Sequence, residues 1–155
     1  MSRIGWYKSR IRIANVSTAY PKTRQQTMRS HASNIEANPA FQILKRSVEI
    51  VAKENHGSLT NFVVDQYGSK KKCRLAVKTA KFKRGVGISI DSKTGKVNFL
   101  YDSYGGYDET AKRITEQVTQ NYVAISLIRV MKSMGYNVVE QKSKSPSSVI
   151  LEGQL

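Results

Sequence analysis

The sequence predicts an α+β fold, in which a single antiparallel meander sheet carries two helices packed on one of its faces. Four segments between residues 59 and 102 are strand-like, and the second of them, residues 72–80, alternates cleanly with the period of two that is typical of half-buried strands. Two other segments repeat apolar residues at spacings of three and four, which indicates amphipathic helices. The length of 155 residues fits one domain of this kind.

The strands are expected in a definite order along the chain. Ile11 and Ile13 alternate with Arg10 and Arg12, which predicts a first strand ahead of the first helix. Turn-forming residues then separate the four strands of a meander, and two short strands follow the second helix. These six strands are expected at residues 59–67, 72–80, 86–91, 96–102, 136–141 and 148–152. The predicted element order is therefore β-α-β-β-β-β-α-β-β.

Both helices have recognisable ends. Asn38 is a favourable N-cap and Pro39 suits the first helical position, while Gly57 is expected to end this helix in the left-handed conformation. Asp108 is expected to cap a second, longer helix that ends at Gly135. Because the second half of that helix is apolar almost all round, we expect it to be the buried central helix of the domain.

Three regions follow from this pattern. Residues 1–16 form a basic arm and the first strand, and the poor alternation of residues 1–10 is typical of a loose arm. Residues 17–38 are polar and predict a long loop or insertion, of a length that often serves a function. Residues 39–155 supply the remainder of one α+β domain.

Composition indicates a reducing compartment. Cys73 is the only cysteine, which excludes an internal disulfide, and no signal-peptide pattern is visible. No segment approaches the roughly 20 apolar residues of a membrane span. We expect a cytoplasmic protein, or one of a plastid stroma or nucleoid-like compartment, without a membrane partner.

The positive charge is concentrated in one half of the chain. The formal net charge is +15, from 26 basic and 11 acidic residues. Residues 1–84 hold 18 Lys or Arg against four acids, a net charge of +14, and residues 85–155 have a net charge of +1. Crowded like charges destabilise a compact chain unless a partner neutralises them. A polyanion, most simply nucleic acid, is the expected partner, although a solubilising surface would have the same composition.

The alternation of the strands predicts where these charges lie. If Ile11 and Val77 face the helices, their neighbours face away, onto the face that an antiparallel sheet leaves open. Same-face residues lie roughly 7 Å apart along a strand, close to the spacing of successive phosphates. The simpler interpretation is a solvated turn at residues 70–72 and strand lysines that discourage aggregation. The candidate nucleic-acid contacts are Arg10, Arg12, Lys70, Lys71, Lys72, Arg74, Lys78, Lys81, Lys83 and Arg84.

Three aromatic residues lie among the cations near the N-terminus. Trp6, Tyr7 and Tyr20 are candidates for stacking on exposed bases, an interaction of roughly 1–3 kcal/mol per base. The alternative is that Trp6 packs against the domain and anchors the arm.

No catalytic, metal or cofactor site is predicted. His31 and His56 lack a neighbour at metal-ligand spacing, and neither a phosphate-binding loop nor a nucleophile motif occurs. Asp65, Asp91 and Asp102 end strands, so a metal-dependent nuclease is an enzymatic alternative, but strand-terminal acids are more often turn formers.

The second half of the chain carries motifs of a known family. A strand with a central glycine at residues 87–90 precedes the Asp-aromatic-Gly turn at residues 101–105. A Gln-containing helix segment at 117–122 and a Gly-Tyr-x-Val-x-Glu segment at 135–140 follow. In this order the motifs resemble the uncharacterised bacterial and plastid family called hypothetical chloroplast reading frame thirty-five, a domain of unknown function. The resemblance implies a fold and no established activity. The element order also resembles the TATA-binding-protein fold class.

The leading hypothesis is a non-enzymatic protein that binds the phosphate backbone of RNA or DNA through a basic sheet face. The alternative is a small adaptor or inhibitor, of phage or mobile-element origin, that binds an acidic protein surface. A nuclease is the third and least favoured hypothesis.

Overall fold

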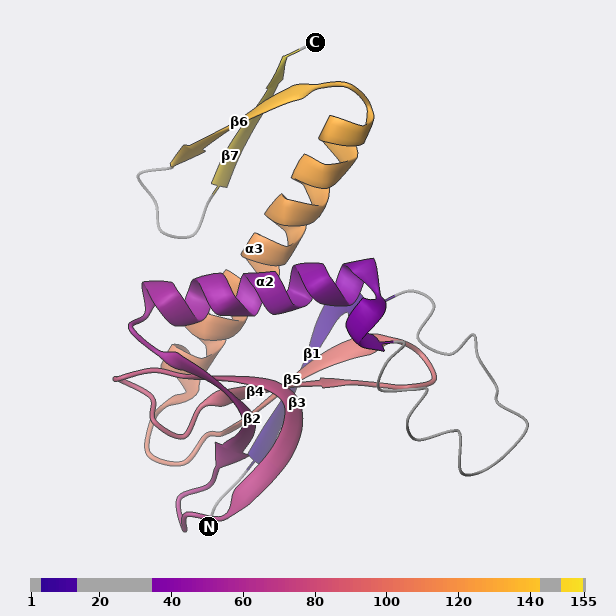
Figure 1. The fold of residues 1–155 in the computed structure, drawn as a ribbon. Coiled ribbons are helices and arrows are strands. Elements are labelled where there is room, and N and C mark those ends of the chain that lie inside the picture. The colour runs from indigo at the N-terminus through magenta and orange to yellow at the C-terminus, as the bar shows by residue number, and fades with distance from the viewer. Residues whose placement is uncertain (1–3, 14–34, 143–148, 155) are drawn as a thin grey trace, which may run out of the picture.

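The α+β class and the order of the elements are confirmed. A computed structural model describes residues 4–13, 35–142 and 149–154 (Figure 1). Its elements are β1 (Ile4–Arg12), α2 (Pro39–Glu54), β2 (Ser58–Val64), β3 (Lys70–Lys78), β4 (Val86–Ile90), β5 (Lys96–Asp102), α3 (Asp108–Ser133), β6 (Asn137–Lys142) and β7 (Val149–Gln154). Five strands form an antiparallel sheet in the order β1-β5-β4-β3-β2.

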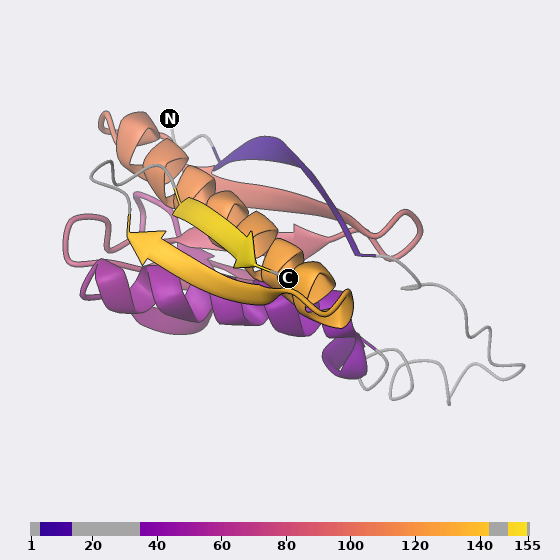
Figure 2. The same ribbon diagram turned by 90° about the horizontal axis from the view of Figure 1, so that it is seen from above.

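Helices α2 and α3 pack on the same face of this sheet, as predicted (Figures 1 and 2). We call it the helix face. Phe41, Leu44 and Val48 of α2 are fully buried against it, and α3 adds Ile114 and Val118. The strands contribute Ile11, Ile13, Val77, Val86, Ile88, Val97 and Phe99 to the same core. Burying side chains of this size stabilises a fold by about 1.5–3 kcal/mol each, so this layer fixes the orientation of every strand.

The opposite side, which we call the far face, is closed at one end by the curl of β2 and β3. The register between these strands shifts between Thr60 and Phe62, and Val63 then packs against Leu100 of β5 in a second, small apolar cluster. Gly87 makes this packing possible, because a Cβ atom there would lie 2.9 Å from Val63 Cγ1 and 3.1 Å from Leu100 Cγ. The predicted open face is therefore open only over part of its length.

The last two strands correct the prediction of a single sheet. β6 and β7 pair with each other in a separate two-stranded sheet. The 26 residues of α3 span about 39 Å at 1.5 Å per residue, which carries the chain beyond the five-stranded sheet. The hairpin instead packs on α3, where Gly153 lies against Met131 (Figure 2).

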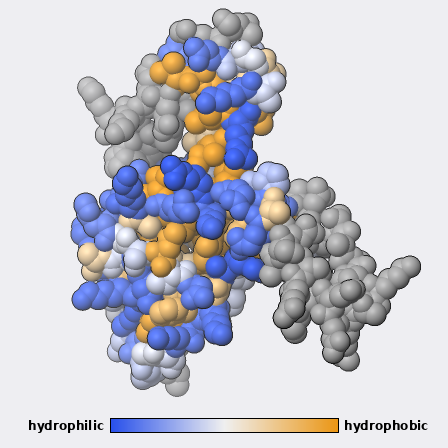
Figure 3. All heavy atoms as spheres, viewed as in Figure 1, coloured by the Kyte–Doolittle hydropathy of each residue, from blue (hydrophilic) through white to orange (hydrophobic). Residues whose placement is uncertain are grey.

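The second half of α3 is exposed, contrary to the prediction of a buried central helix. Val123, Leu127, Val130 and Met134 are 54%, 48%, 53% and 64% exposed. In Figure 1 this half projects past α2, and Figure 3 shows apolar surface on the projecting part. Hydrophobicity in the sequence predicted burial, but the sheet and α2 reach only the first half of the helix.

Both helix ends also differ from the predictions in detail. His56, with φ 49°, and not Gly57, takes the left-handed conformation after α2. Gly57 has a different role, because a Cβ atom there would overlap the carbonyl oxygen of Lys78. Tyr107 precedes α3 at the N-cap without a side-chain hydrogen bond, and Asp108 lies in the first turn, where a negative charge complements the helix dipole.

The N-terminal regions are described in part. β1 begins at Ile4, so the predicted loose arm is strand from that residue onward, paired with β5. Of the predicted insertion at 17–38, residues 17–34 lie outside the described residues, as does Tyr20.

Gly95 provides a test of the contact between β1 and the turn before β5. Its φ is +68°, and a Cβ atom there would overlap the carbonyl oxygen of Ile13, whose N–H donates to Gly95 O at 2.8 Å. Because the clash adds to the left-handed strain, we expect Gly95→Ala to cost about 3 kcal/mol of unfolding free energy, a loss of roughly 6–12 °C in Tm.

Gly68→Ala is the matched control. Its φ is +84° with no heavy atom within 4 Å, so only the conformational strain of about 1 kcal/mol applies. Equal losses of Tm for the two variants in thermal denaturation would contradict this account of the β1 contact.

Candidate nucleic-acid interface

A row of polar and charged side chains runs along β1 on the open part of the far face. Trp6 lies opposite Leu100 in register, Lys8 lies opposite Asn98, and Arg12 lies opposite Lys96. The register with β5 shifts between Lys8 and Arg12, and Arg10 lies within this shift and is exposed. We call Lys8, Arg10 and Arg12 the cationic row.

The pairing of Arg12 with Lys96 is unfavourable within the sheet. Like charges directly opposite each other on antiparallel strands are destabilising. Asp91 lies across the β4–β5 turn from Lys96, with its backbone N–H donating to Lys96 O at 2.9 Å, but within the described ranges it forms no ion pair with Lys96 or Arg12. Its carboxylate accepts from the backbone N–H groups of Lys93 and Thr94 at 2.8 and 2.9 Å. Those two bonds hold the pKa of Asp91 below its ordinary value. An external anion between Arg12 and Lys96 would remove the repulsion.

Two aromatic rings are accompanied by lysines. Lys71 Nζ lies 4.8 Å from the ring centroid of Trp6, which is nevertheless 54% exposed. Lys70 Nζ and Lys78 Nζ lie 4.8 and 3.9 Å from the centroid of Phe62. Each ring therefore has a cation beside it, as in proteins that stack bases and contact phosphates together.

Acidic residues are nearly absent from the strands. All 11 acids of the chain lie in the described ranges, and Asp102 is the single one in the five-stranded sheet, against nine Lys or Arg. Within those ranges the ion pairs are Arg46–Glu49 and Arg84–Asp102. Within the described ranges, Lys and Arg side chains of the five strands therefore form no ion pair with the protein's own acids.

Arg84 is the exception among the predicted contacts. Its guanidinium lies 3.5 Å from Asp102 and donates to the carbonyl oxygen of Tyr104 at 2.7 Å. Asp102 is 1% exposed and also accepts from the backbone N–H of Gln66 at 2.7 Å. Arg84 thus joins the ends of β2, β4 and β5, which is a structural role, and its contact with nucleic acid stays a prediction.

The remaining predicted contacts fall into separate places. Lys72 lies opposite Phe62 in register, and Arg74 is exposed on β3. Lys81 and Lys83 lie in the loop between β3 and β4 and line a cleft beside His56 instead of the sheet face.

The two described stacking candidates lie on opposite sides of β1. Tyr7, opposite Phe99 in register, is 6.4 Å from that ring and belongs to the helix side. Trp6 is on the far face beside the cationic row. The structure places Lys71 over Trp6, sets Arg12 further along the same side of β1, and puts Tyr7 on the other side.

Several residues of the surface were missed by the sequence analysis. Lys8 has the even-numbered alternation of Trp6, Arg10 and Arg12, and this signal was available once the arm was treated as strand. Lys96 required the register with β5, which only the folded chain provides.

Acids and the cysteine offer no catalytic arrangement. Asp91 and Asp102 flank β5 at its two ends, too far apart to share an ion. Within the described ranges, no three His, Cys, Asp or Glu residues gather as a metal ion would require. Burial raises the pKa of the Cys73 thiol above its ordinary value, which disfavours the reactive thiolate.

No family model, curated protein or solved structure matches this chain. The resemblances to the chloroplast reading-frame family and to the TATA-binding-protein fold therefore stay predictions. In the part of the chain that the structure describes, no helix combines the length and apolar character needed to cross a bilayer.

Replacing Arg84 tests its structural role. Arg84→Ala leaves the buried Asp102 carboxylate without its cation, and we expect it to lower the unfolding free energy by about 2–3 kcal/mol in urea titrations. The neighbouring exposed Lys83→Ala should change the unfolding free energy by less than about 0.5 kcal/mol. Similar stability of the two variants would show that Arg84 is free for another role.

Proposed function

We propose that this protein binds nucleic acid, RNA or DNA, without catalysis, and that the open part of the far face is its contact surface. The observation that carries the proposal is the cationic row with Lys96 opposite it, unneutralised and next to the exposed ring of Trp6. Several cations on one face of a sheet suit the repeated phosphates of a nucleic-acid backbone.

The aromatic residues favour single-stranded segments as the ligand. A base must leave its stack to contact a side-chain ring, which an unpaired base does without breaking a duplex. Trp6 lies at one end of the cationic row, so one strand can place a base on its ring and its phosphates along Lys8, Arg10 and Arg12. Contacts of this kind give little sequence preference.

Salt dependence provides the first test. If Lys71, Lys96 and the three residues of the cationic row each neutralise one phosphate, log affinity should fall against log salt concentration with a slope of roughly −3.5 to −4.5. Fluorescence anisotropy of a labelled single strand measures the slope, and binding should also quench Trp6, the one tryptophan of the chain. A slope near −1 would contradict the proposal.

A charge-reversal pair localises the surface. Arg12→Glu with Lys96→Glu should weaken binding by more than about 100-fold, because two phosphate contacts become repulsive. Lys45→Glu with Lys53→Glu makes the same change of net charge on α2, on the helix side, and should weaken binding far less. Equal losses would mean that net charge alone, and not this face, attracts the ligand.

A second candidate function is supported by the projecting half of α3. Val123, Leu127, Val130 and Met134 follow one another at spacings of 4, 3 and 4 residues, the pattern of a helix–helix seam, and all are about half exposed. From residue 117 to 139 the chain carries Arg129 and Lys132 and no acid. This surface, the α3 stripe, fits an amphipathic helix of another protein whose apolar face is flanked by acids.

The adaptor function predicts a protein complex that survives nuclease treatment. Leu127→Asp should abolish it, whereas Val139→Asp, 49% exposed but on β6, should leave it intact. Affinity of the purified partner should fall when its flanking acids become amides. If sedimentation instead shows a dimer of this chain that Leu127→Asp dissociates, the stripe binds a second copy and the adaptor function is wrong.

A further inference from the structure

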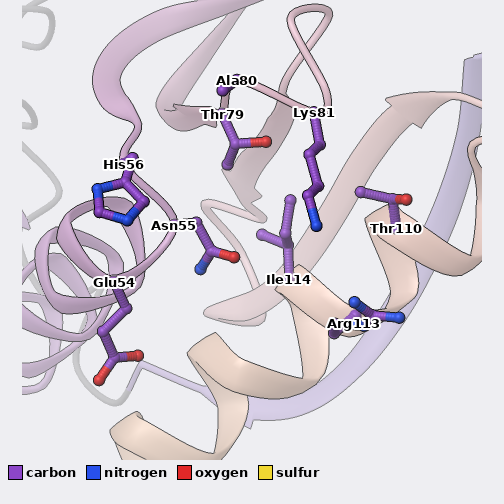
Figure 4. Close-up of a pocket in the computed structure, with 9 residues that line it drawn as sticks. All are labelled: Glu54, Asn55, His56, Thr79, Ala80, Lys81, Thr110, Arg113 and Ile114. Atoms are coloured by element: carbon purple, nitrogen blue, oxygen red, sulfur yellow. The ribbon is translucent and has the colours of Figure 1, made fainter.

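A two-part cleft lies at the C-terminal end of α2. The loop between β3 and β4 and the first turns of α3 form its other walls (Figure 4). The enclosed part is a cavity of about 220 Å³, and a more open hollow of about 350 Å³ shares His56, Thr79 and Ala80 with it.

Four cations line this cleft. Lys81 and Arg113 border the enclosed cavity, and Lys78 and Lys83 border the hollow. None of the four forms an ion pair within the ranges that the structure describes. Glu54 is the one acid among the lining residues, and in Figure 4 its carboxylate points away from Lys81 and Arg113. The cleft is therefore positive and unneutralised.

Neutral hydrogen-bond donors complete the lining. Thr79 Oγ1 accepts from the backbone N–H of Phe82 at 3.0 Å, so its hydroxyl proton is available to a ligand. Thr110 contributes a second hydroxyl from α3. Asn55 Nδ2 donates to Val51 O and Gln117 Oε1 at 2.8 and 3.0 Å, which ties the end of α2 to α3 and fixes the width of the cavity.

The backbone at His56 adopts the left-handed conformation and places the imidazole in the lining of the cleft. Its φ of 49° is the one positive value at a non-glycine residue in the described part of the chain. The bond from Gly57 N to Ala52 O, at 2.7 Å, belongs to a helix end that usually has glycine at this position. A side chain there costs about 1 kcal/mol, and it places an imidazole on the wall shared by the two parts of the cleft.

We infer that this cleft binds a phosphate monoester, the terminal phosphate of a nucleic-acid strand. A monoester carries a charge of about −1.5 to −2 at pH 7 and three acceptor oxygens, which matches several cations and hydroxyls around one cavity. An internal phosphodiester carries a single charge and suits the open cationic row. That the phosphate belongs to a strand rests on the proposed function.

Lys78 connects the cleft with the rest of the basic surface. Lys78 lines the hollow, and its Nζ also lies over the ring of Phe62. Lys70 lies over the same ring, and the next residue, Lys71, lies over Trp6. A strand whose end occupies the cleft therefore meets further cations and rings in the direction of the far face.

The test compares two labelled single strands that differ only at the end, one with a 5′-phosphate and one with a 5′-hydroxyl. We expect the phosphorylated strand to bind about tenfold more tightly, the effect of one or two charge-assisted hydrogen bonds. Arg113→Gln should remove most of this preference and leave the affinity for the hydroxyl strand unchanged. Lys112→Gln, the same change one residue earlier on α3, should preserve the preference. Equal affinity of the wild-type protein for both strands would overturn the inference.

The variant His56→Gly distinguishes the effect of the imidazole on ligand binding from its effect on stability. Glycine relieves the left-handed strain, so Tm should rise, while the preference for the 5′-phosphate should fall if the imidazole contacts the ligand. A variant that loses stability, or one that keeps the full preference, would contradict the role given to His56.

A titration with inorganic phosphate distinguishes failure of the phosphate site from failure of the proposed nucleic-acid binding. If neither strand binds, nucleic-acid binding is wrong, and a phosphate titration followed by NMR then tests the cleft alone. Saturable shifts of the Thr79 and Thr110 amides that Arg113→Gln abolishes would identify a site for a small phosphate compound and overturn the strand end as its source. Absence of such shifts would overturn the phosphate site itself.

Discussion

The packing of α2 and the first half of α3 on one face of the sheet determines where every charge of the sheet lies. Phe41, Leu44 and Val48 occupy the helix face so completely that an unpaired Lys or Arg could not enter it without a large desolvation cost. Since strand side chains alternate, burying Ile11 and Ile13 forces Arg10 and Arg12 to the other side. The cationic row is a consequence of the apolar core.

The same alternation explains why so much of the fold was predictable. Several strands of the sheet alternate polar and apolar residues, and turn residues separate the strands, so local sequence was sufficient to place them. Features that depend on distant parts of the chain were not predictable in this way. The apolar second half of α3 indicated burial, but whether a helix is covered depends on how far the sheet and α2 extend. The separate β6–β7 sheet follows from the length of α3 for the same reason.

The candidate surface was predictable to a similar degree. Arg10 and Arg12 could be assigned to one face from alternation and charge, because the apolar residues Ile11 and Ile13 beside them set the direction. Lys71 could not, because it has the same odd-numbered alternation as Leu75 and Val77 of the helix core, and the register shift between β2 and β3 is what accompanies its place over Trp6. The structural role of Arg84 could not be predicted from the sequence either, because its partner Asp102 is 18 residues away and is buried by the curl of β2. Arg113 belongs to an amphipathic helix, where nothing local indicates that its exposed side lines a cleft.

The placement of the acids favours a binding role for the positive charge of the sheet over a role in solubility alone. A solubilising surface needs only charged groups facing water, and acids serve it as well as bases. Here the acids lie in helices, in turns or in the β6–β7 hairpin, apart from the buried Asp102, while nine cations occupy the strands of the five-stranded sheet. Arg12 lies opposite Lys96, a like-charge pair that is unfavourable within a sheet. A ligand that binds the folded state stabilises it by mass action, so a polyanion would offset the repulsion that the sheet retains. If the proposed function holds, relief of this repulsion on binding would contribute to the affinity for the anion.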